Sequence, residues 1–197
     1  MSKSDAKSAK KERNKLIRWV ITIFFVTIAV SGLISFASAE VMEGSSMAVA
    51  FLILFLIIII GIVFDIVGVA VTSADESPFH SMAARKVRGA QEAIRLLRNA
   101  ERVGSICNDV VGDICGVVSG AASATIAAQI VSNFASTMPQ IISLAMSALA
   151  AGLTVGGKAV GKTFAIRSCT TIVHKTGKVI WLFTHIPQNL REKKNKR

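Results

Sequence analysis

This chain of 197 residues contains no tyrosine, only two tryptophans and three prolines, and about half as many acidic as basic residues, 12 against 23. Soluble proteins that bind nucleic acid are polar throughout and combine basic stripes with stacking aromatic residues. Here the charge is confined to a few segments, which argues against a nucleic-acid partner. The chain is 52% apolar with a mean hydropathy of +0.56 and a net charge of +11, so we expect an integral membrane protein whose main partner is the lipid bilayer.

Cysteine is scarce as well, and its odd number fits neither a disulfide framework nor a paired Cys-x-x-Cys metal site. The three residues are Cys107, Cys115 and Cys169, which we expect to be reduced residues on helices. No Ser-His-Asp or Cys-His arrangement is recognisable, because His80, His174 and His185 fall at the cytoplasmic edge without an obvious nucleophile. The sequence therefore predicts a protein that is not an enzyme and has no resident cofactor.

Long uncharged stretches define the predicted fold. Residues 19–39 and 44–64 are each long enough to cross a hydrocarbon core of about 30 Å as a helix. A third uncharged stretch, residues 114–157, is divided by the polar segment 132–140, which is typical of a helical hairpin. We predict an all-α membrane protein with four transmembrane helices.

The basic residues predict how these helices are oriented, because loops rich in Lys and Arg stay in the cytoplasm. Seven of them precede Trp19, six lie between Arg85 and Arg102, and ten lie from Lys158 onward, which accounts for all 23. The loops around Glu40 and Asn133 contain none. We therefore expect a multi-pass protein of the plasma or inner membrane with both termini in the cytoplasm.

The first predicted span has a second interpretation. A basic segment, residues 1–18, precedes the apolar run 19–39, which ends in Ala37-Ser38-Ala39, and this order also resembles a cleavable secretory signal. Retention as an anchor and cleavage both leave the same orientation for the main domain, residues 44–185. The chain then ends in a basic tail, residues 186–197.

Two amphipathic segments are predicted on the cytoplasmic side. Residues 77–102 interleave charged and apolar positions at three- and four-residue spacing, as in a juxtamembrane helix that lies on the membrane surface and is attracted to anionic lipid. Residues 170–185 are too short and too charged to span, so we predict an interfacial helix that Trp181 anchors and Pro187 ends.

A row of small residues is spaced four apart along the third span. Small residues on one helix face let a second backbone approach closely, which is how membrane helices associate. The row predicts a packed helix contact and consists of Gly104, Asn108, Gly112, Gly116, Gly120, Ala124 and Ala128.

Acidic residues inside spans are rare because burying a charge in the membrane is costly, and they usually mark a pathway or a partner. Asp65 lies near the end of span two, and Asp109 and Asp113 lie one turn apart near the start of span three, beside Asn108. Hard divalent cations such as Mg²⁺ prefer these oxygen ligands. We therefore predict a metal site at these four residues, with pairing of the acids to Arg85, Arg102 or Lys158 as the alternative.

The run 156–163 satisfies the pattern of a phosphate-binding loop, G-x-x-x-x-G-K-T. That pattern is meaningful only after a buried strand and with an acid elsewhere to hold Mg²⁺. Here the preceding residues complete a membrane hairpin, so nucleotide binding is not expected.

Taken together, these segments resemble the transmembrane domain of the cyclin M and CorC magnesium transporters. The family opens its third span with a Gly-Asn-Asn-Leu-Val-Asn-like motif, and residues 107–112 read Cys-Asn-Asp-Val-Val-Gly. Its Gly-Glu-Ile-x-Pro-Lys-Thr motif is similar to residues 157–163, Gly-Lys-Ala-Val-Gly-Lys-Thr, and the likeness covers about residues 47–185. The resemblance implies a homodimer that transports Mg²⁺ or a similar divalent cation.

Two departures from the family bear on function. The resemblance implies that Mg²⁺ is held partly by Asn108 and partly by a glutamate whose position is occupied here by Lys158. A lysine would repel a divalent ion, or take its place by pairing with Asp109 or Asp65. Moreover, the residues after Pro187 do not resemble the family's nucleotide-sensing domains. Two functions follow: a cation transporter or a relative derived from one, and a non-transporting membrane scaffold or partner subunit whose ion site Lys158 closes.

Overall fold

The structure, a computed structural model, describes residues 3–134 and 138–195, and within these ranges it contains helices and no strand. The predicted all-α fold is confirmed. The described elements are, in order, α1 (Lys3–Glu43), α2 (Met47–Ser73), α3 (Ser77–Ala84), α4 (Ala90–Arg98), α5 (Ala100–Ser105), the π-helix η1 (Ile106–Val111), α6 (Gly112–Phe134), α7 (Pro139–Arg167) and α8 (Cys169–Asn195).

Four helical segments are long and apolar enough to cross a membrane, which confirms the predicted number of spans. They are Ile17–Met42, Met47–Ser73, Ala100–Asn133 and Pro139–Arg167. The third consists of α5, η1 and α6, which follow one another without interruption. Most apolar side chains on these segments are exposed, as in a protein whose outer surface faces lipid rather than water.

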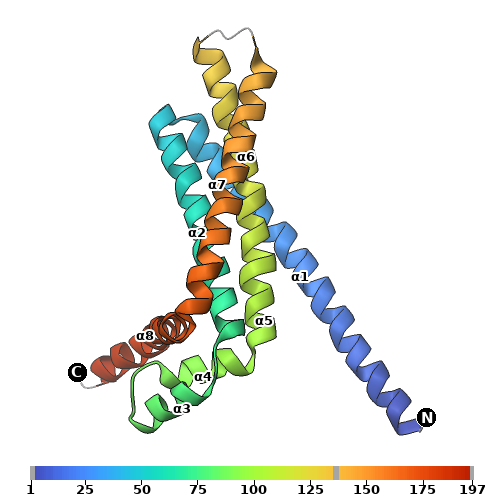
Figure 1. The fold of residues 1–197 in the computed structure, drawn as a ribbon, viewed down its shortest axis with the longest axis vertical. Helices are drawn as coiled ribbons and strands as arrows, with labels where there is room; N and C mark the ends of the chain where they lie inside the picture. The colour runs from blue at the N-terminus through green and yellow to red at the C-terminus, as the bar shows by residue number, and fades with distance from the viewer. Residues whose placement is uncertain (1–2, 135–137, 196–197) are drawn as a thin grey trace.

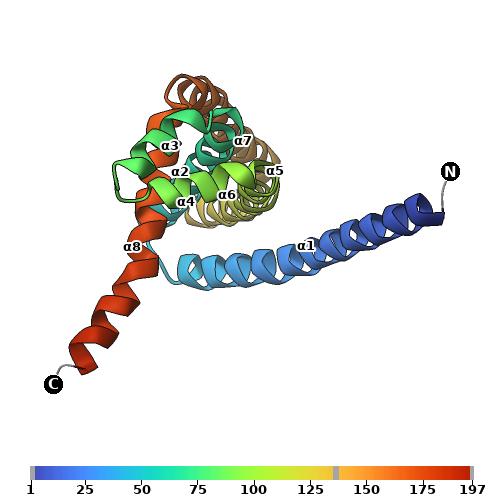
Figure 2. The same ribbon diagram turned by 90° about the horizontal axis from the view of Figure 1, so that it is seen from below.

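The central bundle is formed by α2, α6 and α7 (Figure 1). The turn between α1 and α2, the C-terminal end of α6 and the N-terminal end of α7 lie toward one end of this bundle, whereas α3, α4 and α8 lie at the opposite end. The C-terminal end of α1 contacts α6, and there the side-chain amide of Gln129 on α6 donates a hydrogen bond of 2.9 Å to the Met42 carbonyl of α1. Towards its N-terminus α1 diverges from the bundle, as both views show (Figures 1 and 2).

The prediction of a single juxtamembrane helix over residues 77–102 is wrong. That segment forms three short helices, α3, α4 and α5, with breaks after Ala84 and at Asn99. The first break contains two left-handed residues, Lys86 with φ 57° and Gly89 with φ 85°, a conformation that cannot continue a right-handed helix. The predicted amphipathic character is present in α4, which buries Ala93 and Leu97 and exposes its arginines.

The predicted C-terminal helix, residues 170–185, is present but longer than expected, and the prediction that it ends at Pro187 is wrong. Helix α8 runs through Pro187 to Asn195, so part of the predicted tail 186–197 is helical. A proline inside a helix removes one hydrogen bond at a cost of about 3 kcal/mol, and the Gln, Leu, Arg, Glu and Lys residues that follow favour a helix. Helix α8 crosses the end of the bundle beside α4 (Figure 2).

Two separate apolar clusters stabilise the bundle. The first joins α1, α2, α6 and α7 and consists of Met42, Ala50, Leu54, Ile58, Ala122, Ile126, Ala127 and Met146. The second joins α2 to the short helices, α7 and α8 and consists of Ala70, Val71, Phe79, Ala93, Leu97, Ala165 and Val173. Between them α2 carries Gly61, Asp65 and Gly68, all buried, so the candidate site lies between two apolar layers.

Candidate functional site: a buried acid, amide and ammonium

Asp65 is the buried charge at the centre of this layer. It lies on α2 with 4% of its surface exposed, surrounded along the helix by apolar residues. Its Oδ1 atom is 3.9 Å from Nζ of Lys158 on α7, so the two side chains form an ion pair without a direct hydrogen bond. The Lys158 side chain is 22% exposed, so part of it lies at the surface of the bundle.

Two oxygen atoms at the site have no hydrogen-bond partner among the described residues. They are Oδ2 of Asp65 and Oδ1 of Asn108, and both are buried. An unsatisfied buried acceptor costs about 1 to 3 kcal/mol, and such acceptors are rare in native proteins. The Asp65 atom belongs to the carboxylate that pairs with Lys158, and the Asn108 amide lies against α2 at Gly68, one turn along that helix from Asp65. Carboxylate and amide oxygens are ligands that hard cations prefer.

The absence of a side chain at Gly68 brings the Asn108 amide against α2, one turn from Asp65. A Cβ atom at Gly68 would lie 2.8 Å from Cγ of Asn108, closer still to its Oδ1, and 3.0 Å from Cβ of Cys107. No side chain fits there without displacing the amide. Gly104 makes a similar close approach to α2, with Thr72 as its neighbour.

The π-helix η1 presents Asn108 to α2. A π-turn holds about one residue more than an α-turn, and such turns often occur at functional sites. Residues spaced four apart stay nearly aligned through η1, so Gly104, Asn108 and Gly112 share the face that meets α2 and α7. In the α-helical continuation each step of four residues turns the row by about 40°. The row therefore rotates out of the interface beyond Gly112.

The predicted helix contact is accordingly present in only half of the row. Gly104 and Gly112 are buried, and a Cβ atom at Gly112 would lie 3.1 Å from Nζ of Lys158. Gly116 and Gly120 have nothing within 4 Å of an added Cβ atom, and Gly120 is exposed, as are Ala124 and Ala128.

Two glycines on α7 bring Lys158 close to α2. Gly157 receives the side chain of Ile62, and a Cβ atom at Gly161 would lie 2.8 Å from Cγ1 of Ile66. These glycines also belong to the phosphate-loop pattern, yet here they lie within one long helix and pack against another. Their four-residue spacing is the signal that sequence reasoning missed, because Gly-x-x-x-Gly is a common contact motif of membrane helices.

The structure brings only part of the predicted metal site together. Asp65 and Asn108 both face the layer that contains Lys158, whereas Asp109 and Asp113 are exposed. Successive helical residues point about 100° apart, so a helix that directs Asn108 inward directs Asp109 away. Within residues 3–134 and 138–195, no group of three or more His, Cys, Asp or Glu side chains could hold a metal ion. The alternative, an acid paired with Lys158, is realised at Asp65.

Comparison with known proteins gives no independent guide to the site: no family model, curated protein or solved structure matches this chain.

Proposed function

We propose that this chain is a membrane cation transporter, or is derived from one, in which Asp65 and Asn108 supply the cation site and Lys158 is a tethered cation that occupies it in the absence of an ion. The observation that carries the proposal is the pair of buried oxygens on Asp65 and Asn108 that have no hydrogen-bond partner among the described residues, in the layer where Lys158 pairs with Asp65. A carboxylate buried within a span is expensive and usually functional.

The chemistry of the donors favours a hard cation. One carboxylate, one amide oxygen and several retained waters match the coordination that Mg²⁺ prefers in proteins. Because the Lys158 side chain is partly exposed, its ammonium has a route out of the site when an ion enters. The similarity of residues 107–112 and 157–163 to the cyclin M and CorC motifs supports the same class of substrate.

Flux measurements test this proposal directly. The purified chain is reconstituted in liposomes and uptake is measured separately for Mg²⁺, Mn²⁺, Co²⁺ and Na⁺. Asp65→Asn should abolish uptake, and Asn108→Ala should weaken it, whereas Asp113→Asn should leave it unchanged because Asp113 is exposed outside the site. Uptake that is insensitive to Asp65→Asn would contradict the assignment.

A second function follows from the position of Lys158 itself. If the ammonium never leaves Asp65, the site is permanently closed and the protein is a non-transporting membrane scaffold or partner subunit. The distance of 3.9 Å between Nζ and Oδ1 favours this function as the second candidate. The variant Lys158→Met distinguishes the two functions. If the protein is a transporter, Lys158→Met should still admit ions. If neither the wild-type protein nor Lys158→Met shows flux, the protein is a scaffold or partner subunit.

The proposal includes a location and an assembly. The positive-inside distribution favours the plasma or inner membrane with both termini in the cytoplasm. The open half of the small-residue row, from Gly116 to Ala128, offers a face on which a second copy could pack to form a homodimer.

A further inference from the structure

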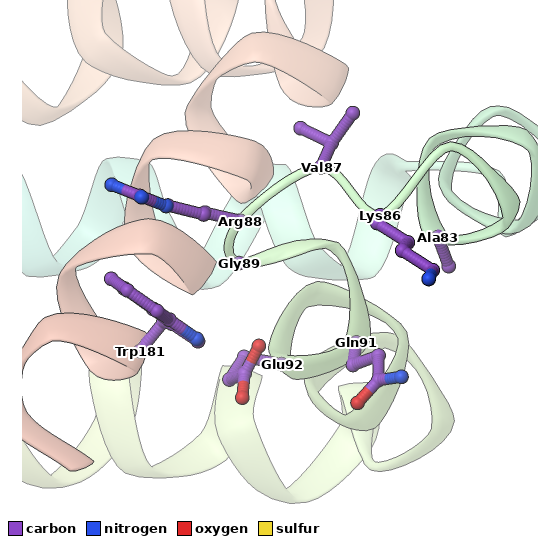
Figure 3. Close-up of a pocket in the computed structure, with 8 residues that line it drawn as sticks. All are labelled: Ala83, Lys86, Val87, Arg88, Gly89, Gln91, Glu92 and Trp181. Atoms are coloured by element: carbon purple, nitrogen blue, oxygen red, sulfur yellow. The ribbon is translucent and has the colours of Figure 1, made fainter. Parts of the chain in front are cut away.

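We propose that a cavity between the α3–α4 loop and α8 binds the phosphate-bearing headgroup of an anionic membrane lipid. The cavity has a volume of about 270 Å³ and lies at the end of the bundle where α8 crosses it. Figure 3 shows Arg88 and Trp181 of α8 together at one end and Lys86 at the other, with Glu92 between Trp181 and Gln91. This inference is independent of the cation site, which is built from other residues.

The loop that carries the two cations has a defined backbone. Lys86 and Gly89 are left-handed, and the Lys86 and Val87 amides donate hydrogen bonds of 2.9 and 3.0 Å to the carbonyls of Ala83 and Met82. Gly89 lies directly on α8: a Cβ atom there would be 2.5 Å from the Lys178 nitrogen. The loop backbone is therefore fastened to both α3 and α8, which fixes the points from which its cationic side chains extend.

Arg88 and Trp181 form one end of the cavity. The guanidinium carbon lies 5.3 Å from the centre of the indole ring, which is cation–π distance. A cation–π contact does not require the N–H donors of the guanidinium, and its planar array of donors is well suited to a phosphate. Lys86 points to the other end and contributes a second, more mobile positive charge (Figure 3).

Glu92 determines where within the cavity an anion would lie. Its side chain is 7% exposed and lines the wall between Trp181 and Gln91. A phosphate would be repelled from that wall and attracted to Arg88 at one end of the cavity, with Lys86 at the other end adding to the positive potential. The carboxylate instead suits the hydroxyl groups of a glycerol headgroup, which can donate hydrogen bonds to it.

The apolar surroundings favour a lipid over a soluble phosphate. Leu182, next to Trp181 on α8, is 43% exposed, and Val179 and Phe183, which are 49% and 75% exposed, lie about 160° around the helix from Trp181. Tryptophan is enriched at the membrane interface, and the exposed apolar side chains of α8 are suited to contact acyl chains there. A lipid would thus place its headgroup in the cavity and its chains along α8.

Trp181 provides a local reporter for a test on the full chain. In a Trp19→Phe background, the purified protein in neutral detergent is titrated with short-chain phosphatidylglycerol, short-chain phosphatidylcholine or glycerol phosphate. We expect a saturable change of Trp181 emission with phosphatidylglycerol only. Native mass spectrometry should count the bound lipid independently of fluorescence.

A charge-matched pair of variants separates the cavity from general attraction. Lys86→Asn with Arg88→Gln should weaken phosphatidylglycerol binding by about thirtyfold, since each cation near an anionic headgroup contributes about tenfold or less. Asparagine is chosen because it tolerates the left-handed backbone at residue 86. Arg95→Gln with Arg98→Gln removes the same charge from exposed positions on α4 outside the cavity and should leave binding unchanged.

Each other outcome would overturn the proposal. Equal weakening in both double variants would indicate diffuse electrostatic attraction, and equal binding of phosphatidylcholine would show that the negative headgroup is irrelevant. Saturation by glycerol phosphate at the same concentration would identify a soluble phosphate instead of a lipid. Circular dichroism on every variant checks that the helices remain folded. The single variant Arg88→Lys retains the positive charge and should bind phosphatidylglycerol more tightly than the Lys86→Asn, Arg88→Gln double variant.

Discussion

The Nζ atom of Lys158 lies 3.9 Å from Oδ1 of Asp65, and the two residues come from different spans that are otherwise apolar at this level. Each charge lowers the cost of burying the other. Because the remaining oxygen of Asp65 and the Asn108 oxygen have no hydrogen-bond partner among the described residues, the pair does not use up the acceptor capacity of the site. This combination underlies the predictions on stability and on cation binding.

Removing one member of the pair should destabilise the fold. Lys158→Met leaves the Asp65 carboxylate buried and unpaired, and we expect the free energy of unfolding to fall by about 3 kcal/mol. This value is at the lower end of the range for broken buried ion pairs, because Lys158 is partly exposed. Adding Asp65→Asn should recover most of that loss, as measured by thermal unfolding in detergent. Lys162→Met, an exposed position one turn along α7, is the matched control. Equal losses at positions 158 and 162 would mean that the ion pair contributes nothing.

Lys158→Glu should distinguish an ion site from a closed one. With glutamate at position 158, two carboxylates and the Asn108 amide would lie in the same buried layer, which is a better set of ligands for Mg²⁺. Millimolar Mg²⁺ should then raise the melting temperature, since a ligand that binds only the folded state stabilises it. The wild-type protein should respond less. If Mg²⁺ raises the melting temperature of neither protein, the hypothesis of a divalent-cation site is wrong and the scaffold hypothesis replaces it.

Glycine at position 68 should be required for the contact between α2 and η1. Gly68→Ala places a Cβ atom against the Asn108 side chain, so we expect a loss of about 1 to 3 kcal/mol in stability from overpacking. Gly116→Ala is the comparison, because nothing lies within 4 Å of its added Cβ atom. Thermal unfolding in detergent measures both variants, and a Gly68→Ala protein as stable as wild type would contradict the observed contact.

A large side chain in the open half of the small-residue row should affect the association of copies but not the folding of the monomer. Gly120→Leu should leave the monomer folded, since the position is exposed and has free space, but it should abolish cross-linking between copies if a second chain packs there. Val117→Leu, a substitution of one exposed apolar residue by another, should cross-link normally. Unchanged cross-linking in Gly120→Leu would place any dimer contact elsewhere.

The direction of insertion can be tested by labelling single cysteines in a background without the three native ones. Cysteine at Ser45, in the turn between α1 and α2, should react with an impermeant maleimide added to intact cells, because that loop contains no basic residue. Cysteine at Ser81 of α3, at the opposite end of the bundle, should react only after permeabilisation (Figure 1). The reverse pattern would mean that the basic end faces outward.

Hydropathy and charge alone determined the large-scale organisation of this chain. Long uncharged stretches have only one low-energy conformation in a membrane, a helix that satisfies its own backbone hydrogen bonds, so four spans follow from the sequence without reference to neighbours. The ends of the helices were harder to predict, because the conformation of individual residues can interrupt or extend a helix that the apolar periodicity predicts. The left-handed residues Lys86 and Gly89 divide residues 77–102, and Pro187 fails to end α8.

Only the tertiary structure decided which polar residues meet. Sequence spacing placed Asp65, Asn108, Asp109 and Asp113 at a similar depth, but depth does not determine the direction in which a side chain points. That direction depends on the extra residue in the turn of η1 and on the glycines at 68, 112, 157 and 161, which let three helices approach closely. The result is a candidate site made of Asp65, Asn108 and Lys158, with Asp109 and Asp113 exposed, because helix rotation and close packing are properties of the assembled bundle.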